Sequence, residues 1–410
     1  MPDRKHVDMN QVIIAGAGPV GLICALRLSQ AEIPVVVCEQ SRALIDDPRA
    51  ATTHPATLEL LSEIGIVREV ERQGLICREF RFWDRPTGEL VATFDHALLA
   101  DETEFPYVVQ CEQFKIARIV LAELDNFPDC RVEFSTRVTG VSDHGDSVTV
   151  TVEHGDGSSG EVSGRFLIGA DGGRSTVRNA VNIEMEGFTY PEKFVVLTTP
   201  FDFAADNNYV FRNYLADPEE WCNLFKVAAD GPPGLWRAVF PATAEQADEE
   251  ILADAAVQAR LQRFFPKTGS YEVTHRNLYV THQRVASTFR KGRVFLAGDA
   301  AHLNNPIGGL GLNGGIHDAM NLAEKLSQAW RAGGDFSALD RYDLQRRTIT
   351  NEFVQKQTMQ NKQRLEERDP KARRRELDRL RKIANDPGRA KEFLMDTSML
   401  ASVRRAATFE

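Results

Sequence analysis

Residues 11–40 read QVIIAGAGPVGLICALRLSQAEIPVVVCEQ, and this stretch decides the fold. A β-branched run at 11–15 is followed by a glycine-rich turn at 16–21, by apolar residues at helical spacing, and by a second apolar run that begins at 34. A strand, a turn, a helix and a strand within about 30 residues are typical of a βαβ unit with parallel strands. The sequence therefore predicts an α/β protein.

The turn GAGPVG at 16–21 has the G-x-G-x-x-G pattern between a strand and a helix, where this pattern carries meaning. Gly16 permits the tight turn, Gly18 lets the backbone approach a pyrophosphate, and Gly21 lets the helix pack closely on the strand. The helix start offers free N–H groups to phosphates. Glu39 closes the second strand, where an acid would bind ribose hydroxyls. The alternative is a tight turn beside an incidental surface acid.

Two more glycine segments follow apolar strands. The first, GADGGRS at 169–175, is by itself no more than a candidate strand-end turn. The second lies within RVFLAGDAAHLNNPIGGLGLN at 293–313, where the strand ends at Asp299. A carboxylate there can accept hydrogen bonds from polyol or ribose hydroxyls. The glycines before a helix predicted to begin near Leu312 let the backbone approach a flat ring system.

These three motifs, in this order, resemble those of the FAD-dependent aromatic hydroxylases, the class A flavoprotein monooxygenases of the p-hydroxybenzoate hydroxylase type. The resemblance spans about residues 11–330. It implies an α/β fold in which an FAD-binding Rossmann-like domain of the glutathione-reductase type carries an inserted mixed-sheet substrate domain and C-terminal helices. The expected division is 1–75, 105–180 and 281–340 for the FAD-binding domain, 76–104 and 181–280 for the substrate-binding domain, and 341–410 for the C-terminal helical segment.

The resemblance also implies which residues hold the cofactor. They are Gly16, Gly18, Pro19, Val20, Gly21, Glu39, Gln40, Arg49, Gln110, Asp171, Asp299, Pro306, Gly309, Gly311, Leu312 and Asn313. Asp171 is expected near the pyrophosphate and Asp299 at the ribityl chain, while Pro306 and the residues after it would border the flavin ring. No metal site is expected.

The implied reaction consumes NADH or NADPH and O2, and the sequence does not choose between the two nicotinamide donors. Reduced FAD forms a C4a-hydroperoxide that hydroxylates a phenolic or hydroxylated heteroaromatic small molecule. Arg212 and Tyr214 share one face of a predicted strand, and Arg212 could pair with a substrate carboxylate. His54 could take part in proton transfer, or could simply cap a helix. Other candidate pocket residues, each of which could instead be ordinary core, are Tyr209, Phe211, Trp221, Phe225, Trp236 and Arg237.

Composition narrows the remaining choices. The 410-residue chain has a formal net charge of −10, which argues against nucleic-acid binding. It has no apolar run of the roughly 20 residues that span a bilayer, and no signal peptide is expected at its polar N-terminus. Six scattered cysteines indicate reduced thiols and a cytoplasmic location. The charged stretch at 360–392 is expected to be a solvated helix, and the tail is a candidate for homodimer contacts.

Three rival functions are compatible with some of these motifs. Another FAD enzyme on the same fold, such as a double-bond reductase or a halogenase, is the first, although the four isolated tryptophans lack the halogenase W-x-W element. A nicotinamide dehydrogenase would explain the first motif but not the other two. A flavin-bound sensor protein is the third. Stimulation of NAD(P)H oxidation by a phenol would separate the hydroxylase from all three.

Overall fold

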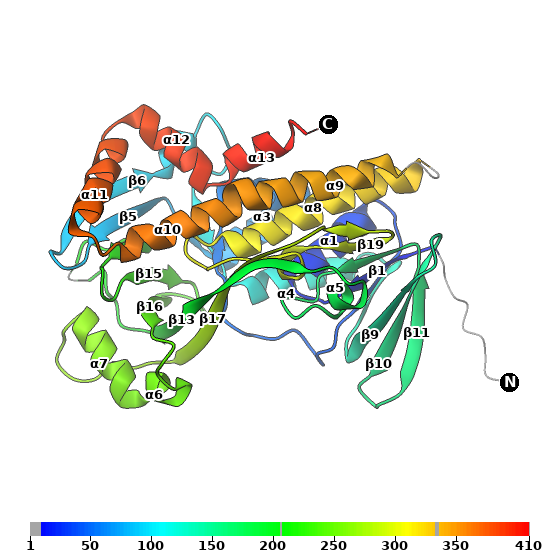
Figure 1. The fold of residues 1–410 in the computed structure, drawn as a ribbon, viewed down its shortest axis with the longest axis horizontal. Coiled ribbons are helices and arrows are strands. Elements are labelled where there is room, and N and C mark those ends of the chain that lie inside the picture. The colour runs from blue at the N-terminus through cyan, green and yellow to red at the C-terminus, as the bar shows by residue number, and fades with distance from the viewer. Residues whose placement is uncertain (1–9, 206, 333–335, 410) are drawn as a thin grey trace.

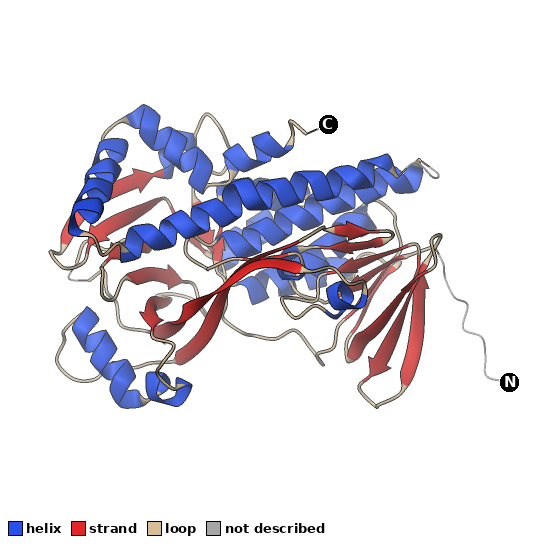
Figure 2. Ribbon diagram, viewed as in Figure 1, coloured by secondary structure: helices blue, strands red, loops and turns tan. Residues whose placement is uncertain are grey.

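The structure, a computed structural model, describes residues 10–205, 207–332 and 336–409 (Figure 1). The first nine residues, to which the signal-peptide prediction refers, lie outside this range. Two large sheets organise the chain, and helices lie on and between them (Figure 2). The predicted α/β architecture is confirmed.

The first large sheet contains the strand that precedes each glycine motif. Its strand order is β18-β19-β12-β1-β2-β8, with bounds β18 (Arg290–Lys291), β19 (Val294–Leu296), β12 (Phe166–Gly169), β1 (Val12–Ala15), β2 (Val35–Cys38) and β8 (Cys130–Glu133). All neighbours are parallel except β18 and β19. Helices α1 (Pro19–Gln30), α4 (Gln113–Leu124) and α8 (Leu310–Arg331) pack together beside it, with α1 against both others. The predicted βαβ unit is therefore present.

The second large sheet is mixed and has eight strands. Its order is β20 (His302–Leu303), β17 (His275–Ala286), β13 (Met185–Thr199), β16 (Leu235–Ala242), β15 (Cys222–Val227), β14 (Arg212–Ala216), β5 (Glu79–Asp84) and β6 (Glu89–Asp95). Helices α6 (Asp248–Leu252) and α7 (Asp254–Phe264) cover one face, where Trp236, Phe240 and Leu261 form an apolar core. The other face is turned toward the first large sheet and its helices: Arg212 on this face donates to Gly308 O before α8, and Arg237 donates to Arg49 O after β2.

Smaller elements connect the two sheets. A three-stranded antiparallel sheet of β9 (Thr136–Asp143), β10 (Val148–His154) and β11 (Ser159–Gly164) lies at one end of the molecule (Figure 2). The other small elements are β3 (Thr52–Thr53), β4 (Leu75–Cys77), β7 (Val108–Gln110), α2 (Pro55–Glu63), α3 (Val67–Gln73), α5 (Thr176–Ala180) and the short turns η1 (His96–Leu99) and η2 (Gly298–Ala300). The sequence pattern favoured one helix over 55–73, but Gly65 adopts φ +84 and separates α2 from α3.

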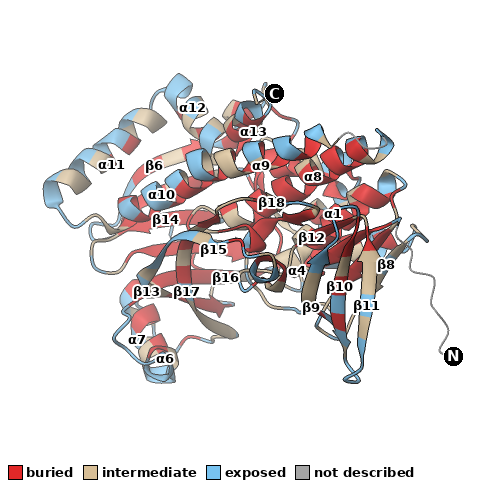
Figure 3. Cartoon of the chain, turned by 45° about the vertical axis from the view of Figure 1, so that its right-hand side comes forward, coloured by how far each residue is buried: buried red, intermediate tan, exposed pale blue. Residues whose placement is uncertain are grey.

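The C-terminal helices cross both sheets. Helix α9 (Ser337–Ile349) continues through a π-helical segment, η3 (Thr350–Gln355), into α10 (Lys356–Glu366), and this rod lies beside α8 (Figure 1). Helices α11 (Pro370–Ala384), α12 (Pro387–Thr397) and α13 (Leu400–Ala406) follow. The charged stretch is helical as predicted, and much of α11 is exposed (Figure 3). It is nevertheless docked on the protein, because α11 buries Leu377 and Leu380 and ion-pairs Arg373 with Asp84.

The predicted domain boundaries stay a proposal. Strands β5, β6 and β13–β16 fall within the proposed substrate-binding segments, whereas β17 runs on past residue 280 and β20 comes from the third segment of the proposed FAD-binding domain. The two parts thus share a sheet at this edge. In the described ranges, no helix combines the length and the apolar character that crossing a membrane requires.

Candidate active site

The three glycine motifs meet at one edge of the first sheet. Strands β1, β12 and β19 are adjacent and parallel, so their carboxyl ends lie together. Gly16 has φ +101, and a Cβ placed on it would lie 2.5 Å from the carbonyl oxygen of Ala170. A Cβ on Gly298 would lie 3.0 Å from Cγ2 of Val20. Motifs that are far apart in the sequence therefore form one continuous backbone surface.

The start of α1 is open to a ligand. Its N-cap is Gly18, which has no side chain to occupy the free N–H groups, and a Cβ placed on Gly18 would meet nothing within 4 Å. Beside it, the Glu39 carboxylate accepts hydrogen bonds from the backbone N–H groups of Ala17 and Ser41, each at 2.8 Å. These bonds fix the carboxylate, and its remaining lone pairs can accept hydroxyl donors. The pair forms a cradle suited to a phosphate and a ribose.

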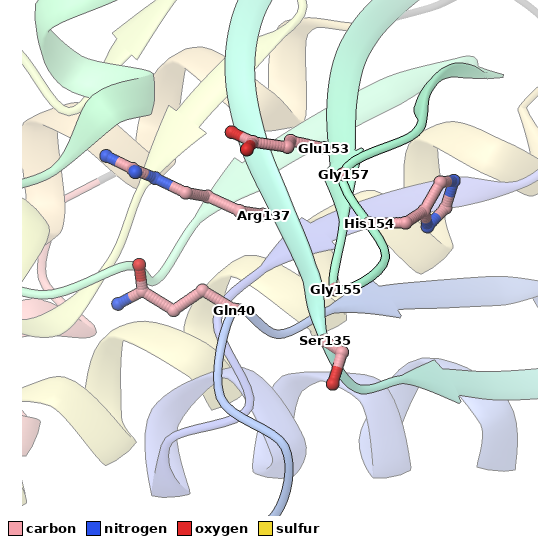
Figure 4. Close-up of a pocket in the computed structure, with 7 residues that line it drawn as sticks. All are labelled: Gln40, Ser135, Arg137, Glu153, His154, Gly155 and Gly157. Atoms are coloured by element: carbon pink, nitrogen blue, oxygen red, sulfur yellow. The ribbon is translucent and has the colours of Figure 1, made fainter.

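A polar hollow of about 480 Å³ lies next to this cradle. Gln40 forms one wall and residues 135–157 of β9, β10 and their turns form the rest (Figure 4). Figure 4 shows the side chains of Gln40, Arg137 and Glu153 directed to the same side, and that of His154 to the opposite side. Gln40 thus borders the polar hollow directly after Glu39, as expected for a residue beside the ADP half of the cofactor.

Three further residues expected at the cofactor have distinct surroundings. Gln110 is fully buried; its Oε1 accepts from Thr52 Oγ1 at 3.0 Å, while its Nε2 has no partner among the residues that the structure describes. An unpaired buried amide is a donor available to a ligand. Arg49 has a largely exposed side chain paired with Asp47. Asp171 caps α5, accepting from Ser175 Oγ and Val177 N, so its carboxylate organises the turn itself.

The start of α8 forms the second half of the cradle. Asp299 is exposed, yet surrounding protein desolvates its carboxyl and raises its pKa above the ordinary value of 3.8. Pro306 is exposed, Gly309 caps α8 at φ 73 without a side chain, and Asn313 donates to Thr52 O and accepts from His54 N. The remaining predicted residues, Gly311 and Leu312, lie in the first turn of α8.

A buried ion network that the sequence analysis missed holds this turn in place. Asp318 is fully buried and accepts from the Gly298 backbone N–H at 3.0 Å, from His302 Nε2 at 2.7 Å and from Arg346 Nε at 2.7 Å. Burial alone would raise the pKa of Asp318, but His302 and Arg346 lower it below its ordinary value. These bonds give His302 a structural role. Asp318 carries no motif signal beyond its place on a buried helix.

On the sheet side, two predicted residues converge on one carbonyl oxygen, and a third, Tyr214, pairs with one of them. Arg212 is 6% exposed and donates to Gly308 O at 3.0 Å and to Tyr214 Oη at 2.6 Å. His54, 1% exposed, bonds the same Gly308 oxygen through Nε2 at 2.8 Å. The shared strand face of Arg212 and Tyr214 is confirmed. The Arg212 guanidinium also lies 5.1 Å from the centre of the Phe80 ring.

The His54 tautomer follows from these contacts. A carbonyl only accepts, so Nε2 carries the hydrogen and Nδ1 keeps its lone pair. Burial and, next, the charge of Arg212 lower the pKa of His54 well below its ordinary value of 6.5, so the ring is neutral. Nδ1 is buried and has no partner in the described part of the chain. His54 therefore stands at the N-cap position of α2, where its side chain makes no capping hydrogen bond, and its Nδ1 is an unused acceptor. A role in proton transfer stays a prediction.

A small cavity of about 10 Å³, the size of a single water, adjoins Arg212 and Tyr214. Phe80 and Phe82 of β5 line it from the sheet side, and Gly308 lines it from the loop before α8. Helices α10 and α12 close it with Gln357, Asn361, Phe393 and Thr397. The sequence gave no signal for these C-terminal residues, because nothing in their spacing marks a contact with a strand about 150 or more positions earlier.

The other proposed pocket residues divide between the two sheet faces. Trp236 packs in the apolar core under α7 and Tyr209 packs at its edge; Trp221 is buried against Phe194. These residues are core, the alternative that the sequence analysis kept open. Phe211 is partly exposed. Phe225 and Arg237 lie on the same face as Arg212, because cross-strand pairs join Arg212 to Phe225 and Phe225 to Arg237.

Comparison with known proteins decides the family. A family model described as "FAD binding domain" matches residues 9–357. The chain belongs to this FAD-binding family. It is 33% identical over 400 residues to para-nitrophenol 4-monooxygenase of Pseudomonas sp. strain WBC-3, covering 96% of each chain. It is also 33% identical over 390 residues to 6-hydroxy-3-succinoylpyridine 3-monooxygenase of Pseudomonas putida strain S16, covering 94% of this chain and 96% of that protein.

A solved structure agrees over the same extent. The p-nitrophenol 4-monooxygenase of Pseudomonas putida DLL-E4 superposes with a TM-score of 0.90 at 31% identity, covering 96% of this chain and 98% of that one. The FAD-binding chain thus shares its whole fold, C-terminal helices included, with an aromatic monooxygenase. The residues described above fit FAD: an uncapped helix start for the pyrophosphate, Glu39 for ribose, the unpaired Gln110 amide and the open α8 turn.

Proposed function

We propose that this protein is an FAD-dependent monooxygenase that uses NADH or NADPH and O2 to oxygenate a phenol or hydroxypyridine. The observation that carries the proposal is the convergence of Arg212 and His54 on Gly308 O, between the start of α8 and the mixed sheet. When bound, FAD supplies electron transfer from the nicotinamide and activation of O2. The side chains of this chain bind and orient the ring.

The small cavity beside Arg212 is proposed to receive the substrate hydroxyl. It has room for about one oxygen atom and is bordered by a guanidinium and the Tyr214 hydroxyl. A positive charge next to a phenol favours its ionised form, which makes the ring more electron-rich. His54 shares the Gly308 oxygen with Arg212, and its Nδ1 is an acceptor without a partner among the described residues; this nitrogen is proposed to take the phenolic proton.

The names of the two relatives indicate the position of attack. In para-nitrophenol 4-monooxygenase the numbered carbon is the one para to the hydroxyl, and it carries the nitro group. In 6-hydroxy-3-succinoylpyridine 3-monooxygenase the numbered carbon likewise carries a substituent opposite the hydroxyl. We propose the same preference for this chain: a substrate with a substituent para to its hydroxyl, oxygenated at that carbon with loss of the substituent.

The test is product analysis with 4-nitrophenol. Oxygenation at the substituted carbon converts 4-nitrophenol, O2 and NADPH into benzoquinone, nitrite, water and NADP⁺, which balances atoms, charge and electrons. We expect nitrite to form in proportion to the nicotinamide consumed. Hydroxylation beside the hydroxyl, with the nitro group retained, would overturn the proposed position. A cytoplasmic location and a homodimer stay predictions of the sequence.

A double-bond reductase or a flavin-bound sensor would share the cofactor cradle. Neither would require a buried guanidinium beside a hydroxyl-sized cavity on the sheet face. Either rival is favoured if no phenol stimulates consumption of NADH or NADPH.

A further inference from the structure

A row of side chains crosses the side of the mixed sheet that faces the start of α8. The pairs Arg212–Phe225, Phe225–Arg237, Arg237–Thr198 and Thr198–His275 link strands β14, β15, β16, β13 and β17 in turn. Directly opposed residues in antiparallel strands project to the same face. Two hydrogen bonds identify that face: Arg212 donates to Gly308 O, and Arg237 Nη1 donates to Arg49 O at 2.9 Å.

The far end of this row carries polar atoms without partners. Arg237 is 2% exposed, its Nε is buried and unpartnered, and none of the described residues forms an ion pair with it. Its two neighbours in the row also hold buried atoms for which no described residue is a partner, Thr198 Oγ1 and His275 Nδ1. Such atoms are unusual in folded proteins, and a cluster of them beside an unpaired guanidinium indicates a missing acceptor.

The spacing of the row suits one small ring. Arg212 and Arg237 are two strands apart, about 10 Å between their Cα atoms, with Phe225 between them. A para-disubstituted benzene laid over Phe225 would direct one substituent toward each guanidinium. Arg212 and Tyr214 already border the cavity assigned to the hydroxyl. The opposite substituent would then meet Arg237.

We propose that Arg237, Thr198 and His275 form a second subsite that binds an oxygen-bearing group, such as nitro or carboxylate, at the position para to the substrate hydroxyl. This inference rests on the proposed function. The Arg237 subsite selects substrates whose para group accepts hydrogen bonds, because only such a group satisfies the buried donors. Arg237 is thus a specificity-determining residue, distinct from the Arg212 cavity at the other end of the ring.

The experiment measures ligand binding to the FAD-loaded protein through the visible spectrum of the flavin, with 4-nitrophenol and 4-methylphenol as probes. The two rings are similar in size, but a methyl group accepts no hydrogen bond. The unaltered protein should bind 4-nitrophenol the more tightly. Arg237→Gln should weaken 4-nitrophenol binding about tenfold to a hundredfold, the range for a hydrogen bond to a charged group, and should change 4-methylphenol binding little.

Lys226→Met is the matched control. Lys226 is a buried cation on the same sheet, one residue after Phe225 and so on the opposite face, with its Nζ 5.4 Å from the Trp236 ring centre. It should leave the preference between the two phenols unchanged. Thr198→Val provides a second, milder variant should Arg237→Gln fail to fold, and it should narrow the same preference.

Equal weakening of both phenols by Arg237→Gln would overturn the subsite, and would show that Arg237 acts only by holding the Arg49 segment. Equal binding of the two phenols by the unaltered protein would overturn it as well. Either result leaves the monooxygenase proposal standing if phenols still stimulate NAD(P)H oxidation. Absence of that stimulation with every phenol would refute the proposed function and, with it, the subsite.

Discussion

Replacing Asp318 with Asn removes the carboxylate that joins three segments of the site. Asp318 binds the Gly298 N–H, His302 and Arg346, and all of these contacts are buried. Breaking a buried ion pair from one side costs about 3–5 kcal/mol, because the remaining charge stays buried without compensation. We expect Asp318→Asn to lower the free energy of unfolding by about 3 kcal/mol. This is the lower end of that range, because the Asn side chain has nearly the same shape as that of Asp and leaves no cavity.

The assay is denaturant unfolding of the protein with and without FAD, together with release of FAD followed by its fluorescence. Because Asp318 positions Gly298, the variant should also release FAD more readily. The pKa of Asp318 is lowered in the folded protein, so its stabilisation is fully present above the ordinary value of 3.8 and is lost only as the pH falls through the folded value. The difference from the unaltered protein should therefore be constant across the neutral range.

Asp340→Asn is the control for this prediction. Asp340 is a largely exposed carboxylate on α9 that pairs with Arg290, and surface pairs contribute about 0–1 kcal/mol. An Asp318→Asn variant that is as stable as Asp340→Asn and holds FAD as tightly as the unaltered protein would refute the reasoning.

Two further predictions follow from buried polar groups. Gln283 accepts from Asn305 N and donates to Thr358 Oγ1 at 2.9 Å, and these bonds hold the loop before Gly308. Gln283→Leu should therefore raise the KM for the phenol even at temperatures well below the melting temperature of the variant. An unchanged KM under those conditions would contradict this prediction. Burial lowers the pKa of His96 to about 4 and that of His317 to about 3, so both are neutral when folded. Below pH 6.5 the unfolded chain binds more protons than the folded protein at these two positions, so the free energy of unfolding should fall by about 2 kcal/mol per histidine at pH 5. Chemical unfolding at two pH values measures this fall, and His96→Asn should make the free energy of unfolding less dependent on pH.

Sequence patterns could predict the cofactor side of the fold because each motif there is local. The strand, turn and helix at 11–30 specify their own geometry, and parallel strands bring the three glycine motifs together. The pattern also indicated that Arg212 and Tyr214 share a face. It could not show that His54 reaches Gly308, since that contact joins residues 254 positions apart.

The substrate side could not be predicted in the same way. Phe393 belongs to a helix whose apolar residues have ordinary spacing, and only the packing of α12 over β5 and β6 brings it to the cavity. The charged stretch was predicted to be solvated because its charges are mixed in sign and leave little apolar face. In the fold, Leu377 and Leu380 form a narrow apolar stripe that is sufficient to dock it. Burial of Arg237 depends on cross-strand register, which no local pattern encodes.

The most direct test of the central claim is NADH or NADPH oxidation by the FAD-loaded protein, followed together with O2 uptake, with and without 4-nitrophenol. The account predicts slow oxidation without the phenol, and a large increase with it, in which one O2 and one phenol are consumed for each nicotinamide. Arg212→Gln should reduce that increase while leaving FAD bound. Oxidation that is equally fast without any phenol, or that no phenol stimulates, would contradict the claim that this site oxygenates an aromatic ring.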